Sequence, residues 1–172
     1  MDTELEHLKT FFDNIPNLKP RASVIVRRAL DYVLDGASHI SELESPEKTP
    51  LGTKIEKYFL KEFDLPMKKT PQVIKRLAKE GIHHQNPKHD TVIAGIPVDC
   101  KNTIRRNWMI SPNCCGIWVL LFKTNCDNYT FSMGLLKTVP ENVSVKWNGD
   151  HKRNVSAKGS AAIHWIIQNE KF

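Results

Sequence analysis

The sequence predicts an α/β (α+β) fold, in which helices pack against a β-sheet. Two observations indicate this class. Apolar residues recur at helical spacing in several segments of the first half, such as 51–63. The second half instead contains β-forming runs between turn signals, and its apolar run 116–123 has the length of a buried central strand. With 172 residues, 40% of them apolar and 26% charged, we expect one domain over 1–172, with an N-terminal helical part over about 1–45.

The N-terminal helical part is predicted from its apolar spacing. That spacing indicates helices over 4–12 and 22–34, and Pro16 and Pro20 interrupt the chain between them. Gly36 is expected to end the second helix, because glycine readily adopts the left-handed backbone that often follows a helix.

Two more helices are predicted before the sheet begins. A helical turn over 41–43 and an irregular loop through Pro46 and Pro50 lead to a helix over 51–63. A second amphipathic helix is expected over 71–79. The expected cap of the first helix is Thr49 or Thr53, its buried stripe is Ile55, Phe59 and Leu60, and the inward residues of the second helix are Val73, Ile74 and Leu77.

A β-hairpin is predicted over 89–101, and it contains the chemistry that the rest of the chain positions. Ala94-Gly95 is a turn signal with β-forming residues on both sides. Residues two apart on a strand point to the same face, so Asp99 and Lys101 should project together. Asp90, near the open end of the first strand, can reach the same place. Two carboxylates beside a lysine suit a hydrolytic Mg²⁺ site, because Mg²⁺ prefers oxygen ligands.

The remaining elements are read from turns and apolar runs. After the central strand over 116–123, Asp127-Asn128 should form a turn into a partner strand over 129–139 that Pro140 ends. A short extension is expected over 143–147 and a basic, turn-rich loop over 148–158. Ser156 is expected to cap a last helix that runs to about Asn169 and buries Ala162, Trp165 and Ile166.

The hairpin resembles the PD-(D/E)xK nuclease motif and, more narrowly, the catalytic segment of NaeI-type restriction endonucleases. In that family an Asp-x-x-Ile-Ala-Gly turn leads into Val-Asp-Cys-Lys, as it does here. An Asp…Asp-x-Lys pattern alone is weak, whereas the whole ordered set over residues 28–160 is specific. The other matching positions are Glu47-Lys48-Thr49, Gly52-Thr53, Glu56, Glu62-Phe63, Trp108-Met109, Pro112, Gly116, Gly134-Leu135 and Lys137.

The resemblance implies a restriction-endonuclease-like core, a mixed central β-sheet flanked by helices. It also implies a Mg²⁺-dependent type II restriction endonuclease that cleaves double-stranded DNA at a specific palindromic sequence, leaving 5′-phosphate and 3′-hydroxyl ends. Mn²⁺ is expected to substitute for Mg²⁺, and no small-molecule cofactor is expected. A symmetric target favours a homodimer. The family member with a further C-terminal DNA-binding domain differs from this chain, which is expected to lack one.

Residue roles follow from the same resemblance. The metal ligands would be Asp90, Asp99 and the backbone carbonyl of Cys100, while Glu56 would hold a second shell or a second metal. Without the family match, Glu56 would be interpreted as a solvated helix residue. Lys101 would orient the attacking water and stabilise the transition state by its charge, a role favoured over a base because carboxylates surround it.

DNA contacts are predicted in two basic segments. Beside the catalytic strand, arginine suits phosphate or guanine and asparagine suits adenine, although a polar surface loop is nearly as good an interpretation. Trp108 is interpreted as core. The candidate DNA-binding residues are Asn102, Arg105, Arg106, Asn107, Lys152 and Arg153.

Net charge and the number and spacing of cysteines are consistent with a cytoplasmic DNA-binding nuclease but do not establish it. The net charge of +6 and pI near 9.2 favour a polyanionic partner such as nucleic acid. The four cysteines form no CxxC pair, which argues against zinc and for reduced thiols in the cytoplasm of a prokaryotic cell. No signal peptide or membrane-spanning run is expected. The histidines 83, 84 and 89 lack a ligand spacing and are interpreted as solvated or phosphate-contacting.

Three other functions remain open from the sequence. The same motif would serve a mismatch- or structure-directed nicking endonuclease of this fold. A non-catalytic DNA-binding protein is disfavoured by the intact set Glu56, Asp90, Asp99 and Lys101. A basic structural protein, in which these residues form surface ion pairs, would be favoured from composition alone.

Overall fold

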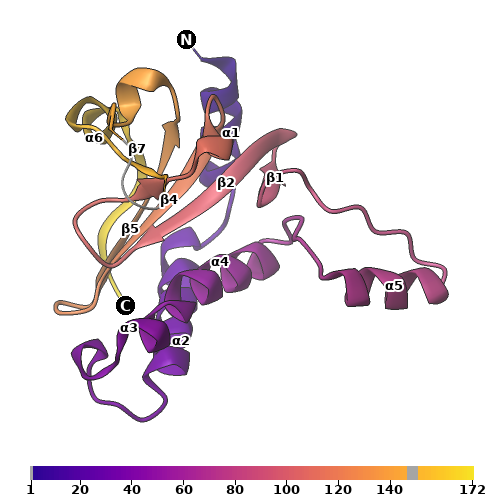
Figure 1. Cartoon of the computed structure of the whole chain (residues 1–172), viewed down its shortest axis with the longest axis horizontal. Helices are drawn as coiled ribbons and strands as arrows, with labels where there is room; N and C mark the ends of the chain where they lie inside the picture. Colours follow the sequence, from indigo (N-terminus) through magenta and orange to yellow (C-terminus); the bar gives the residue numbers. More distant parts are fainter. Residues whose placement is uncertain (1, 147–150) are drawn as a thin grey trace.

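A mixed five-stranded sheet forms the centre of the computed structural model, which describes residues 2–146 and 151–172 (Figure 1). The strand order is β1-β2-β4-β5-β7, in which β2 and β4 run parallel and the other neighbours run antiparallel. The strands are β1 Thr91–Ile93, β2 Ile96–Thr103, β4 Trp118–Asn125, β5 Thr130–Lys137 and β7 His164–Lys171, and a separate ribbon pairs β3 Met109–Ile110 with β6 Arg153–Asn154.

Helices α1, α2 and α4 cover one face of the sheet (Figure 1). Their buried side chains, among them Phe12 and Phe59, pack on strand residues such as Phe122, whose ring centroid lies 5.2 Å from that of Phe59. The helices are α1 Thr3–Asp13, α2 Leu18–Leu34, α3 Ser45–Lys48, α4 Pro50–Glu62, α5 Pro71–Lys79 and α6 Ala157–Ala162, with 3₁₀ turns at Ile40–Glu42 (η1), Pro112–Cys114 (η2) and Pro140–Asn142 (η3).

The other face of the sheet is covered by a smaller apolar cluster. It joins Val119, Leu121 and Leu136 of the sheet to Trp108 and Val155 beside the β3–β6 ribbon. Trp108 is 4% exposed and its indole Nε1 donates to the Phe122 carbonyl at 2.8 Å, which confirms that it belongs to the core. None of the described helices is long and apolar enough to cross a bilayer.

The predicted hairpin and central strand are confirmed. Ala94 and Gly95 have φ of 51° and 78°, the two positive values that a tight hairpin turn between twisted strands requires. Strand β4 lies in the middle of the sheet, and its first five residues are buried because both faces of the sheet are covered there.

The prediction of a last helix running to Asn169 is wrong beyond Ala162. Ser156 does cap α6, since its Oγ accepts from the Gly159 amide at 3.0 Å, but α6 ends at Ala162, which is exposed. The segment that follows is strand β7, which pairs antiparallel with β5. The open edge of β5 offers backbone hydrogen-bond partners over eight residues, and this tertiary pairing overrides the local helical spacing.

Two predictions for the N-terminal part are also corrected. The segment around Pro46 and Pro50 is helical, because each proline occupies the first turn of a helix, where its missing N–H costs nothing. Likewise, α2 begins at Leu18, so Pro20 lies in its first turn and does not interrupt it. Thr49 precedes α4, but its hydroxyl donates back to Ser45 and makes no cap bond.

The remaining differences concern exposure and extent. Helix α5 forms as predicted, but Val73, Ile74 and Leu77 are only half-buried, because α5 stands away from the sheet (Figure 1). The expected extension over 143–147 is a single bridge from Val143 to Val155. The predictions for 147–150 lie outside the described residues.

Candidate active site at the edge of the sheet

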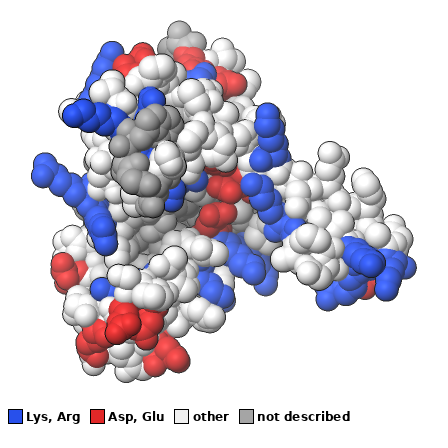
Figure 2. All heavy atoms as spheres, in the orientation of Figure 1, with Lys and Arg blue, Asp and Glu red and all other residues white. Residues whose placement is uncertain are grey.

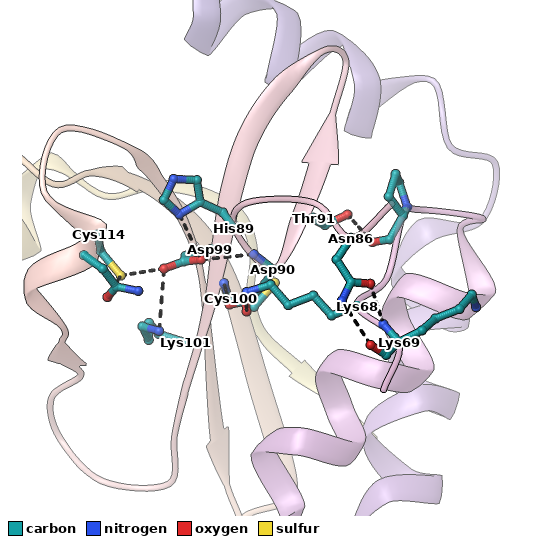
Figure 3. A network of polar contacts seen from close by, with 12 residues as sticks. Lys68, Lys69, Asn86, His89, Asp90, Thr91, Asp99, Cys100, Lys101 and Cys114 are labelled. Carbon is teal, nitrogen blue, oxygen red and sulfur yellow. Dashed lines mark hydrogen bonds and ion pairs between the residues drawn. The ribbon is translucent and has the colours of Figure 1, made fainter. Parts of the chain in front are cut away.

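Asp90 and Asp99 lie side by side because of the register of the hairpin. The β1–β2 ladder ends at the pair Thr91 and Val98, so Asp90 and Asp99 occupy the next positions outward. Each is held by a backbone amide of the other strand: the Asp90 amide donates to Asp99 Oδ1 at 3.1 Å, and the Cys100 amide donates to Asp90 Oδ2 at 2.8 Å (Figure 3). These bonds hold two carboxylates at neighbouring positions at the open end of the hairpin, although like charges repel each other.

The carboxylate of Asp99 is buried and surrounded by donors (Figure 3). The thiol of Cys114 donates to its Oδ2 at 2.6 Å, Lys101 Nζ lies 3.8 Å from the same oxygen, and His89 Nδ1 lies 3.5 Å from Oδ1. Burial raises the pKa of Asp99, but the bond from Cys114 and the charge of Lys101 outweigh it and lower the pKa below its ordinary value. Asp99 is therefore a carboxylate at neutral pH.

Cys114 keeps its proton and so remains a donor to Asp99. Burial, and then the bond to Asp99, raise the pKa of this thiol to about 12. Its position is set by turn η2, where the buried Thr138 hydroxyl donates to the Cys114 carbonyl. A residue distant in sequence thus orients the Asp99 carboxylate.

Glu56 reaches the site from α4, because that helix packs closely on β2. A Cβ added to Gly52, one turn earlier, would lie only 3.0 Å from the Cβ of Asn102. Between α4 and β2 lies a hollow of about 180 Å³. Its lining residues are Thr49, Gly52, Thr53, Glu56, Cys100, Lys101, Asn102 and Phe122.

The environment of Glu56 disfavours its charge. Burial, and then the negative charge of Asp90, raise the pKa of Glu56 to about 7, although the charge of Lys101 opposes the shift. Near neutral pH a large fraction of Glu56 is protonated when nothing neutralises the pair. A divalent cation between Glu56 and Asp90 would relieve this repulsion.

The donor atoms fit a hard divalent cation. Carboxylate oxygens of Glu56 and Asp90 and the Sγ of Cys100 lie within 4.8 Å of one another. Burial raises the pKa of the Cys100 thiol far above its ordinary value, so the protonated sulfur is not a suitable ligand for Mg²⁺. Among the described residues Asp99 is not part of this tight group, since its oxygens face Cys114 and His89.

The structure therefore brings together Glu56, Asp90, Asp99 and Lys101, as the sequence predicted, and adds three residues that it did not. Cys114 is one, and Lys68, whose Nζ lies 3.7 Å from Asp90 Oδ1, is another. His89 is the third. Its side chain is only 10% exposed, so of its two interpretations, solvated or phosphate-contacting, the solvated one is wrong for His89.

The signals for these three differ. The adjacency of His89 to Asp90 offered a hint. The contacts of Lys68 and Cys114 depend on chain segments that approach the hairpin only in the folded protein.

The candidate DNA contacts differ in their availability. Arg105 and Arg106 are exposed in the loop after β2. Asn107 uses its amide within the protein, since Nδ2 donates to the Val155 carbonyl at 3.0 Å and Oδ1 accepts from the Trp108 amide at 2.8 Å.

The other three candidates are half-buried. Lys152 and Arg153 lie at the β3–β6 ribbon, and Asn102 lines the hollow beside Glu56. On the face shown in Figure 2, acidic side chains gather at the floor of a hollow, with lysine and arginine side chains around it.

The comparisons with known proteins agree with this chemistry. Residues 9–172 match the family model described as restriction endonuclease NaeI. No curated protein sequence matches the chain.

Proposed function

This chain belongs to the NaeI restriction endonuclease family, whose members are type II restriction enzymes that act on DNA. We propose that it hydrolyses DNA phosphodiester bonds at a specific, palindromic sequence and that the reaction depends on Mg²⁺. The observation that carries the proposal is the convergence of Glu56, Asp90, Asp99 and Lys101 at one edge of the sheet. Such a cluster supplies both metal ligands and a cation for phosphate chemistry.

The proposed metal ligands are the carboxylates of Asp90 and Asp99 and the backbone carbonyl of Cys100, and Glu56 would lie in the second shell or bind a second metal. Asp90 lies between Glu56 and Asp99. One of its carboxylate oxygens is within 4.8 Å of a Glu56 carboxylate oxygen, and its backbone amide donates to Asp99 Oδ1. When bound, Mg²⁺ would lower the pKa of water and offset charge that develops on the phosphate, and Mn²⁺ should substitute because it also prefers oxygen ligands.

The protein side chains would then orient the reactants. Lys101, beside Asp99 and in the same hollow as Glu56, would hold the attacking water and stabilise negative charge on the phosphoryl oxygens. The water oxygen would lose a proton to solvent and form a bond to phosphorus while the bond to the 3′ oxygen breaks, and that oxygen would take up a proton from solvent. The products would carry 5′-phosphate and 3′-hydroxyl ends.

A homodimer is proposed because two related sites can cut both strands of a palindrome. Size-exclusion chromatography with light scattering tests this, and a stable monomer that only nicks DNA would contradict it. We further propose that the chain acts as a single catalytic domain in the prokaryotic cytoplasm, where its thiols would remain reduced.

The proposed function is tested with a mapped plasmid, Mg²⁺ and end sequencing of the fragments. Discrete double-strand cuts at one recurring palindrome would support it. Nicks confined to mismatched or branched duplexes would instead indicate a structure-directed nicking enzyme. Binding without any cleavage would indicate a non-catalytic DNA-binding protein.

A further inference from the structure

A basic arm projects from the sheet beside the active site (Figure 1). We define the arm as residues 64–90, which leave the end of α4, form α5 and return to β1. None of the residues of α5 is buried. The arm thus holds a helix in solvent at the end of two limbs, and the base of those limbs adjoins the candidate active site (Figure 1).

The arm is an ordered structure, and its two limbs are tied together. The side chain of Asn86 accepts from the Lys69 amide at 2.8 Å and donates to the Lys69 carbonyl at 3.0 Å (Figure 3). At the base, the buried Thr91 hydroxyl donates to the Pro66 carbonyl at 2.8 Å. Thr70 caps α5 by accepting from the Val73 amide at 3.3 Å. These bonds hold α5 in a defined position.

The charge of the arm is strongly positive. It contains six lysines and arginines against three acidic residues, one of which is the site residue Asp90. Within α5, Lys75, Arg76 and Lys79 are exposed and lie on one face by helical spacing, opposite Val73 and Leu77. No salt bridge within the described residues involves these three cations.

The exposed cations of the arm are close enough to repel one another. Lys75 and Lys79 are an i,i+4 pair of like charges on the helix surface, and an anion bound beside them would reduce that repulsion. A further cation lies at the base of the arm, where Lys68 Nζ is 3.7 Å from Asp90 Oδ1. A nine-residue helix is ~13 Å long, enough to follow several phosphates of one DNA strand.

We propose that the arm is a phosphate clamp, in which Lys75, Arg76 and Lys79 bind the backbone of double-stranded DNA beside the scissile bond. The proposal rests on the proposed function, because it places the duplex at the active site. The contacts would be electrostatic and independent of base sequence, so the arm would increase affinity without selecting the recognition site. An apolar contact between two copies of the chain through Val73 and Leu77 is the alternative that the test must separate.

The test measures binding of a fluorescent duplex of about 30 base pairs by anisotropy, in EDTA, over a series of salt concentrations. The variant K75Q/R76Q/K79Q should bind roughly tenfold or more weakly at about 100 mM NaCl, and its slope of log Kd against log salt should fall by about 2 to 3. The matched control K19Q/R27Q/K171Q removes the same charge at α2 and β7, on the opposite edge of the sheet, and should change Kd by less than about twofold.

The charge-conserving variant K75R/R76K/K79R should retain wild-type affinity, and this result separates loss of charge from loss of fold. Equal weakening in the arm and control variants would overturn the proposal. So would an arm variant that becomes monomeric while its affinity per chain is unchanged, since α5 would then be a subunit contact. A wild-type protein that neither binds nor cleaves DNA would instead refute the proposed function.

Discussion

The proposed active site and the arm are both rich in charged residues, but the surroundings of those residues differ. In the site, Asp99 is 3% exposed, and backbone amides, a thiol and a lysine surround it. In the arm, Lys75, Arg76 and Lys79 are exposed and none has an ion pair within the described residues. The first region holds its charges by internal bonds, whereas the second leaves its charges open to solvent.

This difference separates two kinds of function. Charges that are fixed by internal bonds keep a defined geometry, which catalysis needs. Charged side chains on an exposed helix can adjust to the phosphates of a DNA backbone, and binding that is independent of base sequence needs such adjustable contacts. Substitutions in the site should therefore affect the reaction or the folded state, and substitutions in the arm should affect affinity.

The largest effect is expected from Lys101→Ala. Loss of the cation beside Asp99 should reduce the rate of single-turnover DNA cleavage by about 10²- to 10³-fold or more, because the proposed reaction uses its charge to stabilise the phosphoryl oxygens. Lys137→Ala is the control, since Lys137 is a half-buried sheet lysine that pairs with Glu4. A Lys101→Ala enzyme that retains its rate would refute the assigned role.

Glu56→Gln should stabilise the protein in EDTA, and the effect should grow with pH. The pKa of Glu56 is raised from 4.5 to about 7, so the folded state binds its proton more tightly than the unfolded state does. The contribution of Glu56 to the free energy of unfolding therefore decreases as pH rises from about 4.5 to about 7. Replacing the acid removes that loss, which is at most ~3 kcal/mol and smaller after solvent screening.

The measurement for Glu56→Gln is denaturant unfolding at about pH 5 and about pH 8, with Glu62→Gln, on the same helix, as the control. Mg²⁺ should stabilise the wild type more than the variant, since a ligand is lost. Equal stability of the variant and the wild type at the higher pH would show that the Glu56–Asp90 repulsion is absent.

Cys114→Ala should reduce the cleavage rate by about tenfold, because Asp99 loses the thiol that orients it. Cys114→Ser should retain most of the rate, since a hydroxyl can donate in its place. The bond lowers the pKa of Asp99, so its loss should move the acidic limb of the pH–rate profile to higher pH. Cys126→Ala, at another buried cysteine, should leave the profile unchanged. An unchanged profile in Cys114→Ala would remove the positioning role.

The smallest effect is expected from Asn86→Ala, which removes both bonds between the limbs of the arm. Each such bond contributes roughly 1 kcal/mol, so amides of α5 should exchange faster while the global unfolding midpoint stays within about 2 °C. DNA affinity should fall by about threefold. Gln85→Ala, at the neighbouring exposed position, is the control. Unchanged exchange in α5 would show that Asn86 does not order the arm.

The sequence predicted elements best where one local signal was enough. The Ala94-Gly95 turn and the alternation after it placed the hairpin correctly, and with it the pairing of Asp99 with Lys101. The apolar run of β4 identified the centre of the sheet, since only a strand covered on both faces is continuously apolar. The family match over residues 9–172 confirms the resemblance that these motifs carried.

Predictions failed in two situations: where a distant strand offers backbone hydrogen bonds, and where proline lies in a helix and not in a loop. The last helix was expected to run to about Asn169, but the chain from His164 onward is strand β7, because the edge of β5 is available to pair with it. The prolines at 46 and 50 suggested a loop, although proline is compatible with the first turn of a helix.

The sequence by itself determined the fold class and the hairpin with Asp90, Asp99 and Lys101 at its open end, because strand alternation and a tight turn are properties of neighbouring residues. Glu56 was assigned to the same site only through the family resemblance. Only the tertiary structure decided that Cys114 contacts Asp99, that Lys68 faces Asp90, and that α5 stands out from the sheet as a basic arm. Those features depend on how segments distant in sequence pack together, and the local sequence of one segment does not specify that packing.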